Sequence, residues 1–283
     1  MARVLVAGCG YVGEAAANAL REIGWEVEGW TATPASAEKL SGRPYPVRAV
    51  DVTDAGAVSR AAAAFDLVIH CVSSRGGDAA QYRRLYFEGA RNLLQAFPPA
   101  TLLFTSSTSV YPQRDGSEVD ETSSAEPGHE KGKILRETEA LVLAAGGIVV
   151  RLAGIHGPGR SFFVSRFMEG TAVAGPNDRL INHVHRDDIV TALLLLAEQR
   201  AACRGEIFNV VANEAISLGE AYRWLSQQLQ KPLLPAAPAV APRKRAETNK
   251  RVSNRKLRAL GWEPRYPTFE SAMTESILPS FGS

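Results

Sequence analysis

The stretch Arg3-Val4-Leu5-Val6-Ala7-Gly8-Cys9-Gly10-Tyr11-Val12-Gly13 lies near the start of the chain and decides how it folds. After the arginine its first residues are apolar, which predicts a buried strand over 3–7. The amphipathic stretch 14–23, closed by Gly24, predicts a helix. Three glycines with the spacing Gly-x-Gly-x-x-Gly join the two. A strand, this turn and a helix in that order are typical of a dinucleotide phosphate-binding turn.

Each glycine of this turn has its own expected task. Gly8 permits the tight turn, Gly10 lets a pyrophosphate approach the backbone, and Gly13 lets the helix pack close to the strand. The start of the helix offers free N–H groups and a partial positive charge to the phosphates. The alternative is a glycine-rich turn that binds nothing.

Beyond the turn, short apolar runs alternate with longer amphipathic stretches. This alternation predicts an α/β fold, a Rossmann-type doubly wound parallel sheet covered by helices on both faces. The predicted strands are 3–7, 26–30, 47–50, 67–71, 102–105, 148–152 and 206–210, and the predicted helices are 14–23, 81–97, 133–145, 187–198 and 218–230.

The pattern changes toward the C-terminus. Pro232, Pro235, Pro238 and Pro242 predict a stiff connector, and a basic, turn-rich tail follows. We expect a dinucleotide-binding domain over 1–155 plus about 183–215, and a smaller substrate-binding lobe over 156–182 plus 216–283. A cleft at the strand ends is expected between them.

Composition narrows the class of protein. The chain has 283 residues and a formal net charge of +2, so no global field favours nucleic acid or a membrane surface. Cys9, Cys71 and Cys203 are too widely spaced for a zinc pattern and cannot all pair in one chain. No signal peptide or apolar run of about 18 residues is present. We therefore expect a cytoplasmic protein that binds neither nucleic acid nor membrane.

The end of the second predicted strand decides which dinucleotide binds. An acid there would bind the ribose hydroxyls of NAD, and an arginine would favour NADP. The chain has Thr31-Ala32-Thr33, and the acid Glu28 lies mid-strand. The two hydroxyls favour NADP, with NAD as the alternative, and Lys39 or Arg43 are candidate helpers.

Asp51 follows the third predicted strand in Asp51-Val52-Thr53. A carboxylate here can accept from the adenine amine, or it can cap the helix expected from about Asp54. The candidate cofactor-binding residues are Gly8, Gly10, Tyr11, Val12, Gly13, Thr31, Thr33, Asp51, Val52, Cys71 and Lys133.

Several further blocks of the sequence stand beside the glycine turn and Asp51. They are 104–111 (Phe-Thr-Ser-Ser-Thr-Ser-Val-Tyr), 151–159 (Arg-Leu-Ala-Gly-Ile-His-Gly-Pro-Gly), 183–188 (His-Val-His-Arg-Asp-Asp), 250–254 and 257–267. Taken together, these blocks resemble an extended short-chain dehydrogenase/reductase, the group that contains NAD-dependent sugar epimerases and dehydratases. The tail is similar to that of the group's atypical members, and the resemblance covers nearly the whole chain.

Three positions depart from the family pattern. Ala7 stands where the extended type has its first turn glycine, and Tyr86 stands where a helix motif usually has asparagine. His129 stands where the catalytic tyrosine of Tyr-x-x-x-Lys is expected.

The resemblance implies a catalytic set of Ser107, His129 and Lys133. Ser107 would hydrogen-bond the reacting oxygen, although Ser106 or Thr108 could serve as well. Lys133 would bond the nicotinamide ribose, or else be a solvated lysine of a first helical turn. Tyr111 is a rival acid that the family uses structurally.

His129 precedes Lys133 by four residues, so both share a helical face if the helix has begun. Imidazole can transfer protons near neutral pH, although its shorter ring could need a bridging water. The alternative is a loop histidine.

Three further groups have structural explanations beside functional ones. His183 and His185 share one strand face and, with His156, could suggest a metal, but we expect none. Asp187 and Asp188 are expected to cap the next helix. A basic cluster could hold a substrate diphosphate or form a solvated helix face. Its members are Arg243, Lys244, Arg245, Lys250, Arg251, Arg255, Lys256 and Arg258.

The sequence thus predicts an NAD(P)-dependent oxidoreductase or epimerase. It would act by hydride transfer on a carbonyl or secondary alcohol, with a sugar or nucleotide sugar as a candidate substrate. The alternatives are a cofactor-binding sensor or scaffold that has lost its acid, and a reductase whose lysine alone is the acid–base group. By analogy with the family, a homodimer would pair through the helices 81–97 and 133–145.

Overall fold

The computed structural model describes residues 1–74, 76–172, 179–233 and 248–281. The chain divides into two compact units. The first unit comprises 1–110, 125–151 and 189–208, and the second comprises 111–124, 152–188 and 209–283. The second unit takes in 111–124, which the sequence analysis placed in the first, because strand β6 (Glu118–Val119) pairs with strand β13 (Arg251–Val252).

A seven-stranded sheet has the order β11-β7-β5-β4-β1-β2-β3. Strand β1 pairs in parallel with β2 and β4, β2 with β3, and β4 with β5. This confirms the predicted doubly wound α/β fold, since the chain order reverses between β1 and β4. The strands are β1 (Arg3–Ala7), β2 (Glu26–Thr31), β3 (Val47–Ala49), β4 (Leu67–His70), β5 (Thr101–Ser107), β7 (Ile148–Leu152) and β11 (Ile207–Val210).

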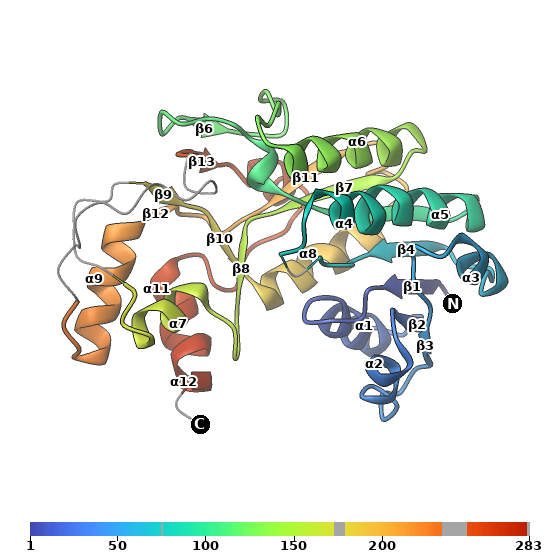
Figure 1. Ribbon diagram of the computed structural model, residues 1–283, viewed down its shortest axis with the longest axis horizontal. Coiled ribbons are helices and arrows are strands. Elements are labelled where there is room, and N and C mark those ends of the chain that lie inside the picture. The colour runs from blue at the N-terminus through green and yellow to red at the C-terminus, as the bar shows by residue number, and fades with distance from the viewer. Residues whose placement is uncertain (75, 173–178, 234–247, 282–283) are drawn as a thin grey trace. The chain divides into compact units, whose positions relative to one another are not determined.

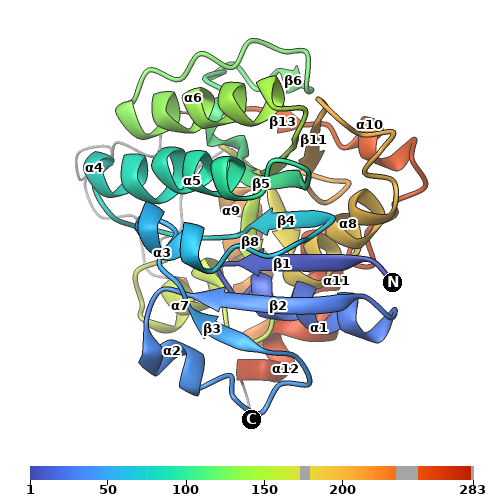
Figure 2. The ribbon, with the colours of Figure 1, turned by 90° about the vertical axis from the view of Figure 1, so that its right-hand side faces the viewer.

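Helices of the first unit cover this sheet. Helix α1 lies against β1 and β2, whereas α5 contacts α3 and α6. Figures 1 and 2 show α5 and α6 running side by side. The helices are α1 (Gly13–Glu22), α2 (Pro34–Glu38), α3 (Ala55–Arg60), α4 (Ala79–Tyr82), α5 (Gly89–Ala96), α6 (Glu130–Ala144) and α8 (Arg186–Glu198).

Two helix predictions need correction. The helix predicted over 81–97 is a helical run in which the π-helical segment Arg83–Glu88 separates α4 from α5. Helix α6 begins at Glu130 rather than at Lys133. The second correction changes the position of His129 relative to the helix.

The second unit has its own short strand pairs and helices. Strand β8 (Gly154–His156) pairs in parallel with β10 (His183–His185), and β12 (Ile216–Ser217) pairs antiparallel with β9 (Leu180–Ile181). Its helical segments are α7 (Phe162–Met168), α9 (Leu218–Leu229), α10 (Arg255–Arg258), α11 (Phe269–Ala272), a π-helical Met273–Ile277 and α12 (Leu278–Phe281).

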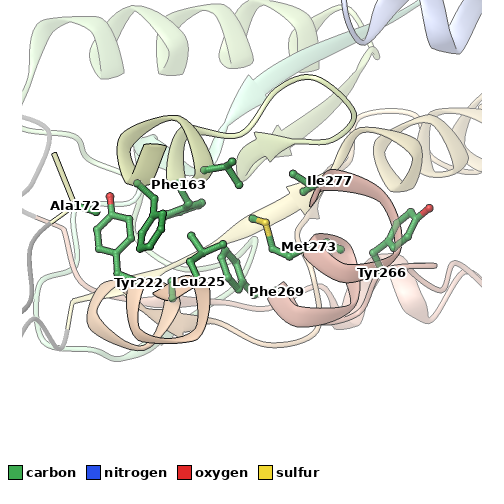
Figure 3. Close-up of a cluster of buried hydrophobic side chains, with 12 residues drawn as sticks. Phe163, Ala172, Tyr222, Leu225, Tyr266, Phe269, Met273 and Ile277 are labelled. Atoms are coloured by element: carbon green, nitrogen blue, oxygen red, sulfur yellow. The ribbon is translucent and has the colours of Figure 1, made fainter. Parts of the chain in front are cut away.

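A separate hydrophobic core holds the second unit together. Phe163 of α7, Leu225 of α9 and Phe269 of α11 are at most 8% exposed and converge in Figure 3. Burial of each such side chain stabilises the fold by about 1.5–3 kcal/mol. Among the described helices, none has the length and apolar character that a membrane span requires.

Candidate functional site

The glycine turn has the geometry that the sequence predicts. Gly8 has a φ of +97°, and a Cβ there would lie 2.5 Å from the Val72 backbone nitrogen. The backbone N–H groups of Gly8 and Cys9 both donate to the Trp30 carbonyl, at 3.0 and 2.9 Å. The turn therefore crosses tightly over the end of β2, as only glycine at position 8 allows.

The other two glycines differ in their surroundings. A Cβ on Gly13 would lie 2.2 Å from the Gly8 carbonyl oxygen, whereas a Cβ on Gly10 would meet no atom within 4 Å. Helix α1 begins after Val12 without a side-chain cap. An open backbone face beside an uncapped helix start fits a pyrophosphate, which would accept from the free N–H groups.

The end of β2 presents hydroxyls and no unpaired carboxylate. Thr33 caps α2, accepting from the Ser36 N–H at 3.3 Å, and Thr31 donates to the Thr33 carbonyl at 3.3 Å. Glu28 accepts from the Trp30 indole N–H at 2.7 Å and from Arg48 at 3.2 Å. Glu28 is therefore engaged within the sheet.

Arg43 and Lys39, the two residues expected to help bind a 2′-phosphate, have different surroundings. Arg43 forms an ion pair with Glu14 in the first turn of α1. That pair offsets the negative charge of Glu14 next to the turn. Lys39, at the end of α2, is exposed.

Asp51 does not cap the next helix, which corrects one of its two predicted roles. Its Oδ1 accepts from the Thr53 N–H at 2.9 Å, and Asp54 caps α3 by accepting from the Ala57 N–H at 2.9 Å. The adenine role remains a prediction. The neighbouring Val52 is buried, and its carbonyl accepts from Asn92 at 2.9 Å.

Two cysteines lie at the glycine turn: Cys9 is within it, and Cys71 directly follows strand β4. The Cys71 N–H donates to the Ala7 carbonyl at 2.8 Å. Burial raises the pKa of the Cys9 thiol to about 11 and that of Cys71 to about 12. Both thiols are therefore protonated at neutral pH, so they are poor nucleophiles.

Three neighbouring hydroxyls at the end of β5 are distinguished by burial. Ser106 and Thr108 are 6% and 7% exposed, whereas Ser107 is partly exposed. Ser106 donates to Oε1 of Glu139 at 2.6 Å, while Ser107 Oγ accepts from the Ser109 N–H at 3.2 Å. Of these three hydroxyls, that of Ser107 is thus the one that a ligand can reach.

Glu139 belongs to a buried network that the sequence analysis missed. It accepts from Arg151 at 3.1 and 2.8 Å, and Arg136 also pairs with it. Glu139 is 0% and Arg151 1% exposed. The signal in the sequence was an arginine inside the apolar run 148–152, since a buried charge requires a partner.

His129 is the N-cap residue of α6. Its backbone is extended, and its Nδ1 accepts from the Gly132 N–H at 3.0 Å. The helix starts after the histidine, so the condition under which His129 and Lys133 were expected to share a helical face is not met. Both side chains are exposed.

The two tyrosines singled out in the sequence are buried. In the second unit, Tyr111 is 0% exposed and its hydroxyl donates to Asn209 at 3.0 Å. In the first unit, the Tyr86 hydroxyl accepts from the Ser74 N–H at 3.3 Å. These positions give both tyrosines structural contacts.

Three histidines gather inside the second unit. The His156 ring centroid lies 4.9 Å from that of His183 and 6.0 Å from that of His185. Burial lowers the pKa of His183 and of His185 to about 4, and it holds the pKa of His156 well below its ordinary value. Within the described ranges, no group of three potential ligands has metal-binding geometry.

The predicted capping role of Asp187 and Asp188 is wrong. Helix α8 starts at Arg186, so both acids lie inside its first turn. Asp188 instead accepts from the backbone N–H groups of Arg265 and Tyr266 at 2.6 and 3.2 Å. This buried carboxylate joins two segments of the second unit.

The basic cluster is dispersed where it is described, and 243–245 lies outside the described residues. Lys250 is buried and donates to the Tyr111 carbonyl at 2.8 Å. Arg255 pairs with Glu118, and Arg258 pairs with Glu263 at 2.8 Å. These side chains have separate partners, which fits a surface of individual ion pairs better than a single site for a substrate diphosphate.

Comparisons with known proteins agree with this geometry. The model of a family described as "NAD dependent epimerase/dehydratase family" matches residues 4–211. Protein YeeZ of Escherichia coli is 32% identical over 226 residues, covering 75% of this chain and 78% of YeeZ.

Two solved structures are similar over almost their full length. One, from Methylobacillus flagellatus, is named provisionally as an NAD-dependent epimerase/dehydratase. It is 28% identical with a TM-score of 0.80, covering 100% of this chain and 99% of that one. The other, UDP-glucose 4-epimerase of Thermus thermophilus in complex with NAD, is 21% identical with a TM-score of 0.83, covering 99% of each chain. The second likeness concerns the fold alone.

Proposed function

Because this chain belongs to the NAD-dependent epimerase/dehydratase family, we propose that it is an oxidoreductase or epimerase acting by hydride transfer on a carbonyl or secondary alcohol. The observation that carries the proposal is the open backbone face at Gly10 beside the uncapped start of α1. The backbone N–H groups at the start of α1, including that of Gly13, would donate hydrogen bonds to the pyrophosphate.

A bound nicotinamide would supply or accept the hydride. Ser107 would donate its hydroxyl hydrogen to the reacting oxygen, since it is the accessible hydroxyl at the end of β5. Lys133 would hold the ribose hydroxyls and add positive potential, which stabilises negative charge on that oxygen. Thr31, Thr33, Asp51, Val52 and Cys71 would line the remainder of the cofactor site.

The cofactor proposed is NADP, with NAD as the alternative. Support comes from the end of β2, where Glu28 is engaged and the remaining side chains are hydroxyls. No carboxylate there would repel a 2′-phosphate. The substrate class proposed is a sugar or nucleotide sugar, because the sequence blocks resemble those of sugar epimerases and dehydratases.

Calorimetric titration of the purified protein with NAD, NADH, NADP and NADPH tests the proposal. Cofactor oxidation is then followed against keto compounds and nucleotide sugars. We expect micromolar binding and turnover of at least one class. Failure to bind any of the four nucleotides would overturn the proposal.

A sensor or scaffold is the second candidate, favoured by one observation. His129 replaces the expected acid and is engaged with its own helix. Tight cofactor binding without turnover across the panel would support this alternative.

The proposal also includes a cytoplasmic homodimer. The three cysteines are free, as in a reducing compartment. Dimerisation would use the helical run 79–96 and α6. Light scattering combined with gel filtration tests it, and a monomer would contradict it.

A further inference from the structure

The position of the ring proton on His129 follows from its capping contact. Nδ1 lies 3.0 Å from the Gly132 backbone nitrogen, and a backbone N–H can only donate. Nδ1 must therefore present its lone pair. In the neutral ring the proton then resides on Nε2.

The surroundings of Gly132 hold the ring in this position. A Cβ on Gly132 would lie 2.8 Å from His129 Cε1 and 2.5 Å from Pro127 Cβ. Glycine thus stands where the ring and the proline lie close to the helix backbone. His129 is packed against its own first turn.

This contact conflicts with proton transfer by His129. A base needs a free lone pair, yet Nδ1 is engaged and Nε2 carries the proton. An acid needs the imidazolium, whose Nδ1–H would face the Gly132 N–H. Either role breaks the cap that begins α6.

Unlike the His129 ring, the Lys133 ammonium is not engaged in the first turn of the helix. Its backbone N–H donates to the His129 carbonyl at 3.1 Å, which fixes its place in the first turn. Its side chain is exposed and makes no hydrogen bond or ion pair with a described residue. By contrast, the Lys131 ammonium lies 5.1 Å from the ring centroid of Tyr82. In this turn the unengaged proton-bearing group is the Lys133 ammonium.

We infer that Lys133 carries the proton of the reaction and that His129 is a positioning residue, the cap that fixes the turn holding Lys133. This inference rests on the proposed function. In reduction, a bound reduced nicotinamide would supply the hydride for the carbonyl carbon, and the π pair would move onto the oxygen. That oxygen would take a proton from Lys133 Nζ, and the amine would recover one from water. The three N–H bonds of the ammonium allow it to contact the ribose as well.

Three variants and one spectroscopic measurement test this. His129→Asn retains a capping oxygen without a titratable ring, His129→Ala removes the cap, and Lys133→Met removes the ammonium. We expect His129→Asn to unfold at the wild-type temperature, to keep turnover within about threefold, and to keep the inflection of the kcat pH profile. His129→Ala should unfold earlier and lose more turnover, while Lys133→Met should lose at least about a hundredfold.

Long-range nitrogen–proton NMR of the cofactor-free protein reports the tautomer independently of turnover. We expect the His129 proton on Nε2. A proton on Nδ1 would overturn the capping assignment. A stable His129→Asn that loses turnover as severely as Lys133→Met, or loses the pH inflection, would overturn the role of Lys133. Absence of turnover in the wild-type protein would overturn the proposed function and the role of Lys133 with it, leaving the tautomer measurement to decide the cap.

Discussion

The Ser106 hydroxyl donates to Oε1 of Glu139 across 2.6 Å, and both side chains are buried. The adjacent Ser107 points its accessible hydroxyl elsewhere, so neighbours of the same residue type have separable roles. Ser106→Ala should lower the free energy of unfolding by about 1.5–3 kcal/mol, because a buried carboxylate loses a donor. Ser107→Ala should leave stability within about 0.5 kcal/mol and lower kcat about a hundredfold. Urea unfolding and steady-state kinetics measure both, and equal effects on stability would contradict the distinction.

The glycine turn allows binding to be separated from folding. Gly10→Ala should fold as the wild type, since its Cβ meets no atom within 4 Å, yet it should weaken dinucleotide binding at least about tenfold by blocking the pyrophosphate. Gly13→Ala should destabilise the fold by about 2 kcal/mol, because its Cβ would meet the Gly8 carbonyl. Calorimetric titration and thermal unfolding check the pair. Unchanged affinity in Gly10→Ala would show that the open face is not the phosphate site.

Thr33 offers a test of cofactor choice that leaves α2 capped. Thr33→Asp keeps an N-cap oxygen and adds a carboxylate at the end of β2, whereas Thr33→Asn keeps the cap without charge. The affinity for NADPH should fall at least about tenfold in the aspartate variant alone, since a carboxylate repels the 2′-phosphate. The affinity for NADH should stay within about twofold. Equal losses in both variants would point to the cap rather than to charge.

The buried histidines should make stability fall with acid. Burial lowers the pKa of His183 and of His185 to about 4, below the value of about 6.5 in the unfolded chain. The unfolded state therefore binds more protons between these values. Stability is full above this window and is lost as the pH falls through it. From about pH 7.5 to about pH 5.5 each histidine should cost about 1.4 kcal/mol.

Nearby charges modify this dependence, and a variant isolates one histidine. Burial raises the pKa of Asp188 to about 6, which opposes the loss by about 0.8 kcal/mol over the same interval. Asp187 raises and Arg186 lowers the pKa of His185. His183→Phe removes one titrating ring beside Phe269 and should reduce the acid sensitivity by about 1.4 kcal/mol in urea unfolding at the two pH values. An unchanged dependence would show that His183 is not buried neutral.

The sequence predicted the sheet well because its strands are apolar on both faces. Strand β1 has the predicted bounds, and the covering helices shift by few residues. The start of α6 was missed because histidine is not a usual cap residue and Lys133 looked like a first-turn position. The π-helical segment in the run 79–96 keeps nearly the helical pattern of apolar residues, so periodicity did not reveal it.

Within the site, local geometry was predictable and tertiary partners were not. The roles of Gly8 and Gly13 follow from spacing along a few residues. By contrast, Asp188 receives its N–H donors from Arg265 and Tyr266, far along the chain, and looked like a cap. Ser107 could be separated from Ser106 only once Glu139 and its partner were located in space.

The parallel pairing of β6 with β13 joins Val119 to Val252, which lies much further along the chain. During synthesis, β6 leaves the ribosome long before its partner exists. The nascent second unit must therefore wait with an unpaired strand edge until β13 emerges, because distant pairings form late. Synthesis of β13, rather than growth of the N-terminal sheet, then times when the second unit can complete this strand pair.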